Sequence, residues 1–220
     1  SCPKKWMFRY KDSLVPIAEP EALNYGTAVH SALAAFYAGK PTPSLTPEME
    51  ALVAGYIECD PISAMGHTVV GVEEEGMVPL RSPSGRAAQW LLFAYKVDLR
   101  TVDPQGNQWL VDHKTSNAPL DRGWLTLSDQ ARYYLWAYWQ KGLRPVGITW
   151  NLLRKPTIRK KQNETQPEYV ERLRADIPTR TEFYYQREQI ITDCNDLPKI
   201  QRELWDVSHI IGKGPIVRNP

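Results

Sequence analysis

Two carboxylates and an amine lie in neighbouring apolar stretches of this sequence. Asp98 lies within residues 95–100, and Asp112 and Lys114 lie within residues 109–115. Because side chains alternate between the two faces of a strand, Asp112 and Lys114 share one face. If Asp98 points the same way, these charges converge at a place where burial is costly unless a metal ion and a substrate phosphate complete the cluster. The combination predicts metal-dependent cleavage of phosphodiester bonds.

The two stretches are predicted to be strands joined by a turn. Pro104 and Gly106 interrupt the apolar pattern between them, in the segment 103–107. His113 falls between Asp112 and Lys114, so its ring is expected on the opposite face of the strand.

The elements that must hold these strands are indicated by apolar spacing and by turn residues. Helices are expected at 25–37, 128–141, 164–176 and 197–211, and a short helix or turn at 1–10. A further helix is expected to run to residue 59 from the cap Thr46, with Pro47 in its first turn. Strands are expected at 69–72, 78–80, 91–100, 108–115 and 148–153. This order predicts an α/β fold with a mixed central β-sheet flanked by helices.

Length and composition agree with a globular protein. With 220 residues, 42% of them hydrophobic, the chain can bury a full core, and we expect residues 1–220 to form a single domain. No apolar run approaches membrane-spanning length, and the N-terminus lacks the apolar core of a signal peptide. We therefore expect a cytoplasmic protein without a membrane partner.

Basic residues are concentrated in two places, although the net charge is only +2. The first cluster interleaves Lys and Arg with aromatic residues in the segment 4–11, and the second comprises Arg154, Lys155, Arg159, Lys160 and Lys161. Basic groups beside aromatic rings suit phosphate contact and base stacking. Either cluster taken singly fits a solvated surface equally well.

In its order of motifs the sequence resembles the PD-(D/E)XK nuclease superfamily and, within it, the RecB-like branch. That branch includes the nuclease domains of RecB and AddB, CRISPR-associated adaptation nucleases and many phage exonucleases. The motifs are residues 1–6, 26–30, Glu73, Asp98, 112–115 and 130–134. The resemblance implies a restriction-endonuclease-like core and metal-dependent hydrolysis of DNA, more specifically by an exonuclease acting on ends or single strands. DNA would be the partner, with a helicase, recombination or CRISPR protein as a further one.

The resemblance also implies roles for individual residues. Its metal ligands for Mg²⁺ or Mn²⁺ would be His30, Asp98, Asp112 and the backbone carbonyl of His113, with Glu73 as a further acid near the site. Lys114 would hold or polarise the attacking water, while Gln130 and Tyr134 would position the DNA and the lysine. The nucleic-acid contacts would be Arg132, Arg154, Lys155, Arg159, Lys160 and Lys161.

Each of these motifs has a simpler interpretation. His30 could be an ordinary helix residue, and Asp98 and Asp112 could be surface acids at strand ends, although their apolar neighbours argue against that. Gln130 and Tyr134, four residues apart, could form the polar stripe of an amphipathic helix. Glu73 begins a run of three glutamates that could be a solvated strand end.

Two features depart from the family pattern. Relatives usually carry glycine at the position of Tyr95, and a ring there could narrow the DNA channel or fill space. The iron–sulfur members place one cysteine before the first helix, as Cys2 is here, and three more near the C-terminus, whereas Cys59 and Cys194 are isolated. A [4Fe–4S] cluster is therefore expected only if further cysteines follow the chain end.

Three functions are consistent with the sequence. The first is an active metal-dependent deoxyribonuclease. The second is a catalytically inactive nucleic-acid-binding subunit of a recombination, repair or CRISPR-type complex, and the third is an interaction domain that keeps only the fold. The intact set of Asp98, Asp112 and Lys114 favours the first.

Overall fold

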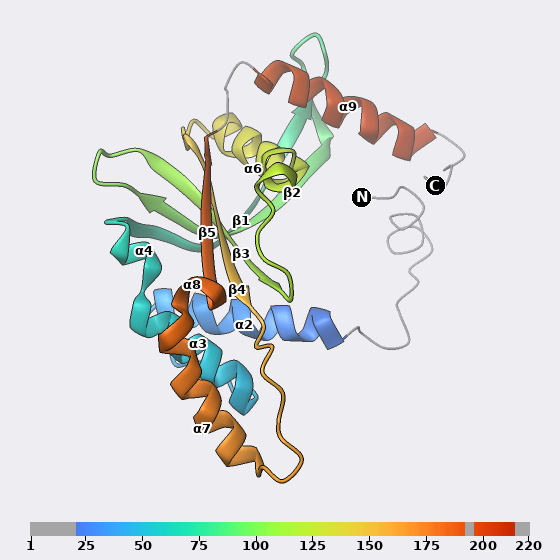
Figure 1. Cartoon of the computed structure of the whole chain (residues 1–220). Helices are drawn as coiled ribbons and strands as arrows, with labels where there is room; N and C mark the ends of the chain where they lie inside the picture. Colours follow the sequence, from blue (N-terminus) through green and yellow to red (C-terminus); the bar gives the residue numbers. More distant parts are fainter. Residues whose placement is uncertain (1–20, 192–195, 214–220) are drawn as a thin grey trace. The chain divides into compact units, whose positions relative to one another are not determined.

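The computed structural model describes residues 21–191 and 196–213 (Figure 1). The expected helix or turn at 1–10, the basic cluster at 4–11, Cys2 and Cys194 lie outside the described residues. Cys59 is a free, exposed thiol at the end of a helix.

Helices and strands follow one another largely as the pattern predicts. The elements are α2 (Glu21–Tyr37), α3 (Pro47–Cys59), α4 (Pro61–Ala64), β1 (Thr68–Arg81), β2 (Ala87–Val102), β3 (Gln108–Ser116), α5 (Arg122–Thr126), α6 (Asp129–Gln140), β4 (Gly147–Arg154), α7 (Gln166–Asp176), the 3₁₀ helix η2 (Ile177–Arg180), α8 (Thr181–Tyr184), β5 (Tyr185–Ile191) and α9 (Leu197–Lys213). The predicted α/β arrangement is confirmed.

The strands form a five-stranded sheet in the order β1-β2-β3-β4-β5 (Figure 1). Strand β3 pairs antiparallel with β2 and parallel with β4, and β4 pairs antiparallel with β5. The sheet is therefore mixed, as predicted. The segments expected as two strands at 69–72 and 78–80 belong to one strand, β1, which contains three consecutive glutamates between its apolar ends.

Strand β5 was not among the predicted elements. Its sequence, YQREQII, is mostly polar, and after the buried Tyr185 half-buried and exposed positions alternate along it, as expected when one face packs inward. Strand β4, which pairs parallel with β3 and antiparallel with β5, has a different pattern, since its residues are buried almost throughout.

Caps explain where the helices next to the site begin and end. Thr46 accepts a hydrogen bond from the Met49 amide and begins α3, as expected, and Asp60 ends α3 in a left-handed conformation with φ of 30°. Helix α7 begins at Gln166 instead of residue 164 because Thr165 and Glu168 form a capping box.

One hydrophobic core joins α2, α3 and α7. It contains Val29, Leu33, Leu52, Tyr56 and Leu173, all fully buried. This packing fixes the face of α2 that carries His30 against the sheet, because α2 contacts both α3 and β3.

The described residues fall into two compact units. One contains residues 77–94 and 196–213, and the other contains residues 21–76 and 95–191. That residues 1–220 act as a single domain stays a prediction. Every site residue discussed below lies in the second unit.

A membrane-spanning helix is not found in the described part of the chain, where each helix is too short or too polar.

Candidate active site

The pairing of β2 with β3 brings the two aspartates together. Leu99 lies opposite Val111 in the antiparallel register, and the pairing ends there, so Asp98 and Asp112 lie next to the point where it ends. Both residues sit inside apolar strand segments, and Asp112 is 5% exposed. The expectation that Asp98, Asp112 and Lys114 form one cluster agrees with this geometry.

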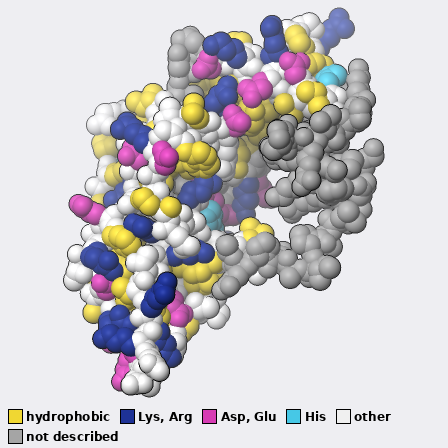
Figure 2. Space-filling view, turned by 45° about the vertical axis from the view of Figure 1, so that its right-hand side comes forward, with side chains coloured by type: hydrophobic (Ala, Val, Ile, Leu, Met, Phe, Trp, Pro, Cys, Tyr) yellow, Lys and Arg dark blue, Asp and Glu magenta, His cyan; other side chains and the backbone are white. Residues whose placement is uncertain are grey.

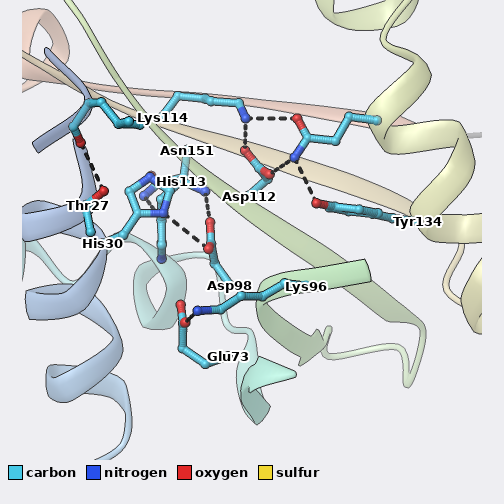
Figure 3. A network of polar contacts seen from close by, with 12 residues as sticks. Thr27, His30, Glu73, Lys96, Asp98, Asp112, His113, Lys114, Tyr134 and Asn151 are labelled. Atoms are coloured by element: carbon cyan, nitrogen blue, oxygen red, sulfur yellow. Dashed lines mark hydrogen bonds and ion pairs between the residues drawn. The ribbon is translucent and has the colours of Figure 1, made fainter. Parts of the chain in front are cut away.

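A glutamine holds the lysine and the second aspartate in place (Figure 3). The Lys114 ammonium lies 2.7 Å from Oδ2 of Asp112 and donates to Oε1 of Gln130 at 3.0 Å. The amide nitrogen of Gln130 donates to Oδ1 of Asp112 at 2.7 Å and lies 3.3 Å from the Tyr134 hydroxyl, to which it also donates. Residues of β3 and α6 thus form one closed polar network, in which Gln130 and Tyr134 share a face of α6 as their spacing predicts.

Asp98 is held by two groups from different elements. Its Oδ1 contacts Nδ1 of His30, from α2, at 3.2 Å, and its Oδ2 accepts a hydrogen bond from the His113 backbone amide at 2.7 Å (Figure 3). Although burial alone would raise the pKa of Asp98, the hydrogen bond and charge of His30, together with His113, hold that pKa below its ordinary value. Burial lowers the pKa of His30, but Asp98 outweighs it and leaves the pKa of His30 raised.

Asp112 has the opposite electrostatic balance. Burial raises its pKa to about 6, even though the adjacent Lys114 ammonium acts to lower it. The repulsion from Asp98 acts in the same direction as burial. Two carboxylates thus lie close to one ammonium, and burial disfavours the charged form of Asp112 unless a further cation lies nearby.

Glu73 reaches the site from β1 with an unusual backbone. Its φ is 51°, in the left-handed region that residues other than glycine rarely adopt. Its carboxylate forms an ion pair with Lys96 of β2, at the edge of the group of residues in Figure 3. The next residue, Glu74, instead binds Arg100 through two carboxylate oxygens and accepts from the Tyr138 hydroxyl at 2.6 Å. Two successive carboxylates of β1 thus have different partners.

These side chains line an open pocket of about 500 Å³. Its lining comprises the acids Glu73, Asp98 and Asp112, the bases His30, Lys96 and Lys114, the amide and hydroxyl groups of Gln130, Tyr134, Thr27, Ser31 and Thr115, and Leu23, Gly26 and His113. A side chain at position 26 would crowd Thr115, since its Cβ would lie 3.3 Å from the Thr115 hydroxyl. The glycine of the motif 26–30 thus lets α2 approach β3 closely at the pocket wall.

The His113 ring lies on the opposite face of β3, as alternation predicts. It is 1% exposed, stacks on Tyr37 of α2 and meets the rings of His30 and Tyr56 edge to face. Burial lowers its pKa to about 4, so the ring is neutral near pH 7. Its Nδ1 lies 2.8 Å from the amide nitrogen of Asn151, a contact between β3 and β4 that the sequence does not indicate.

Tyr95 lies outside the pocket. Its ring is buried against Tyr138 of α6, and its hydroxyl accepts a hydrogen bond from Lys141 at 2.8 Å. A Cβ at Gly76 would lie 2.6 Å from that hydroxyl, so the ring occupies space that a side chain at position 76 would need. Of the two expectations for this residue, filling space fits the structure.

The basic residues expected to contact DNA lie in different surroundings. Arg132 pairs with Asp129 on α6, while Arg154 and Lys155 cover the rings of Phe183 and Tyr25. Residues 159–161 are exposed in the loop before α7. Lys and Arg side chains gather at the lower end of the face in Figure 2, where Figure 1 places α7 and this loop. These six residues are not part of the pocket lining, and their role in binding DNA stays a prediction.

The donor chemistry of the pocket suits a hard divalent cation. Asp98 and Asp112 both line the pocket and supply carboxylate oxygens, the ligands that such cations prefer. Among the described residues, no three His, Cys, Asp or Glu side chains already surround a metal position. The carboxylate oxygens are instead engaged by other side chains: His30 binds Asp98, and Lys114 and Gln130 bind Asp112. A cation at the aspartates would compete with these contacts.

Comparison with known proteins identifies the fold. The family model described as "PD-(D/E)XK nuclease superfamily" matches residues 1–209, which agrees with a restriction-endonuclease-like core. Members of that superfamily typically use divalent metal ions such as Mg²⁺. No curated protein matches the chain. A solved structure titled "Crystal structure of SSO0001" aligns with 94% of this chain and 84% of its own, at 9% identity and a TM-score of 0.35.

Proposed function

Because the chain belongs to the PD-(D/E)XK nuclease superfamily, we propose that it is a metal-dependent DNA nuclease of the RecB-like branch, acting as an exonuclease on DNA ends or single strands. The observation that carries this proposal is the closed network of Asp112, Lys114 and Gln130 beside Asp98 in an open pocket. Two carboxylates close together in the lining of one pocket are costly for a purely structural network and suit a bound cation.

The metal would be Mg²⁺ or Mn²⁺, held by Asp98 and Asp112 with His30 and the His113 carbonyl. When bound, it would supply a Lewis acid for the phosphate and a more acidic water. Glu73, which lines the same pocket, would be a further acid close to it.

The chain's own residues would divide the remaining work. Lys114 would hold the attacking water and balance the negative charge that develops on the phosphate as water attacks phosphorus and the P–O bond breaks. Gln130 fixes the position of this ammonium by accepting from it at 3.0 Å while donating to Asp112. Tyr134 accepts from Gln130 and thereby limits which rotamers of the amide fit.

The direct test is digestion of end-labelled linear DNA, single- and double-stranded, with Mg²⁺, Mn²⁺ or EDTA. We expect cleavage with a divalent cation and none with EDTA. Circular single-stranded DNA is the control for exonuclease action, since a true exonuclease leaves it intact. DNA binding without cleavage under every metal condition would contradict the proposal and favour the inactive nucleic-acid-binding subunit.

A further inference from the structure

Two large apolar side chains are exposed on the connection between β3 and α6. Trp124, on α5, is 61% exposed, and Leu127, three residues later, is 78% exposed. Residues three apart in a helical turn lie on the same side. Leu125 between them is 1% exposed and anchors the segment to the protein interior. The pair therefore forms a small apolar surface on an anchored turn.

This turn is ordered by its own hydrogen bonds. The Asp121 carboxylate accepts from the amides of Gly123 at 2.9 Å and Trp124 at 3.3 Å, which caps α5. The amide of Leu127 donates to the Trp124 carbonyl at 3.2 Å, which closes the turn. Because the backbone is already fixed, a ligand that binds to the two side chains would order little of the chain.

The apolar surface is close to the proposed catalytic lysine. The Trp124 ring lies 6.4 Å from the ring of Trp150, centroid to centroid, and the Lys114 ammonium lies 5.1 Å from the Trp150 ring. Trp150 is the β4 partner of Asp112 in the parallel register and is fully buried. The buried ring of Trp150 is thus near both the exposed tryptophan and the lysine.

One exposed cation lies beside this apolar surface. The Arg122 side chain, on the same short helix, is 73% exposed and has Glu188 as a distant partner at 3.8 Å. The two acids that flank the turn are engaged elsewhere, Asp121 as the cap and Asp129 with Arg132. An exposed aromatic ring beside an exposed cation is the arrangement that single-stranded nucleic-acid sites use for bases and phosphates.

We propose that Trp124 and Leu127 form a stacking platform for an unpaired base of the substrate strand next to the phosphate that is cleaved. The proposal rests on the proposed function and names its substrate as single-stranded DNA or the frayed end of a duplex. In an intact duplex both faces of a base are covered by its neighbours, so a base can lie against the indole only where stacking is broken.

The test uses binding and cleavage separately. Trp124→Ala is compared with Trp124→Phe, which keeps an aromatic face, and with Ile191→Ala, which removes an apolar side chain that is 75% exposed on β5. Binding is measured by fluorescence anisotropy in EDTA, with labelled single-stranded DNA, blunt duplex DNA, and a single strand carrying consecutive abasic residues. Thermal unfolding of each variant confirms that the fold is kept.

We expect Trp124→Ala to weaken binding of the normal single strand roughly tenfold, in keeping with the contribution of one stacked base. Trp124→Phe should keep most of the affinity, and Ile191→Ala all of it. The loss should disappear on the abasic strand and on the blunt duplex. With a divalent cation, the same loss should appear in KM for the single strand while kcat stays unchanged.

An equal loss of affinity on the normal and abasic strands, or no loss on either strand, would overturn the stacking platform. This outcome is distinct from failure of the nuclease proposal. Binding in EDTA reports on the platform whether or not the wild-type protein cleaves DNA.

Discussion

The side-chain amide of Asn151 donates a hydrogen bond to Nδ1 of His113, with 2.8 Å between the two nitrogens. The same amide nitrogen donates to the Tyr56 hydroxyl at 2.9 Å, and that hydroxyl contacts the one of Tyr37 at 2.9 Å. The His113 ring is thus fixed from β4, α3 and α2 together. The backbone amide of His113, one residue from Asp112, is one of the two groups that hold Asp98.

Replacing Asn151 by leucine should therefore weaken metal binding, although Asn151 is not itself one of the proposed metal ligands. We expect Mn²⁺ affinity, measured calorimetrically, to fall by about tenfold, in the range seen when a supporting partner of a metal ligand is removed. Thr149→Val is the matched control, because Thr149 is fully buried on the same strand but bonds to Gln189. Unchanged Mn²⁺ affinity in Asn151→Leu would show that the amide only fills the core.

Replacing Gln130 should lower kcat more than replacing Tyr134. Gln130→Ala removes one hydrogen bond from the Lys114 ammonium and another from Asp112, and hydrogen bonds to charged groups contribute about 1.5–3 kcal/mol each. We expect kcat to fall at least tenfold with DNA affinity retained. Tyr134→Phe removes the 3.3 Å contact to Gln130 and a hydrogen bond with the Lys96 backbone, but no contact to Asp112 or Lys114, so it should lower kcat less. The reverse order of the two variants in single-turnover cleavage would contradict this account of the network.

The exposed basic loop should contribute to DNA affinity through charge alone. Replacing Arg159, Lys160 and Lys161 by glutamine should lower affinity and reduce the slope of log K against log salt by about two to three. Lys40→Gln combined with Lys199→Gln, both at exposed positions, serves as the control. An identical salt slope in the loop variant would mean that these residues are a solvated surface.

His67 should make folding stability depend on pH. Burial lowers its pKa below the ordinary value of 6.5, although Asp103 opposes this, and Thr101 lies 3.0 Å from its Nδ1. Because the pKa of His67 is lower in the folded than in the unfolded state, the unfolded state takes up the proton more readily. The contribution of neutral His67 to the free energy of unfolding is therefore present above pH 6.5 and is lost as the pH falls below it.

Urea unfolding in EDTA at pH 7.5 and 5.5 measures the effect. We expect His67→Gln to lose less stability between the two values than the wild type does. The comparison must be between proteins, because the raised pKa of His30 acts in the opposite direction. Equal losses in both proteins would contradict the assignment to His67.

Much of the site could be predicted from the sequence because it follows from local periodicity. Alternation along β3 separates Asp112 and Lys114 from the His113 ring, and a spacing of four on α6 joins Gln130 to Tyr134. The predicted strand at 108–115 ends one residue before β3 does.

What could not be predicted depends on contacts between distant segments. The link between Asn151 and His113 arises from the parallel register of β3 and β4, which nothing in either strand specifies. The left-handed backbone at Glu73 has no signal in the sequence, because this conformation is usually marked by a glycine and position 73 is a glutamate. Trp124 carries a signal, an aromatic residue in a polar connection, but its exposure and its distance from Trp150 come only from the fold.

The central claim is that Asp112 and Lys114 carry out metal-dependent cleavage, and one measurement tests it most directly. Single-turnover cleavage of end-labelled single-stranded DNA is compared for the wild type, Asp112→Asn and Lys114→Ala, with DNA binding measured in parallel. The account predicts Mg²⁺- or Mn²⁺-dependent cleavage by the wild type, its loss in both variants, and DNA affinity that is largely retained. Cleavage within a few-fold of the wild-type rate in either variant would contradict it.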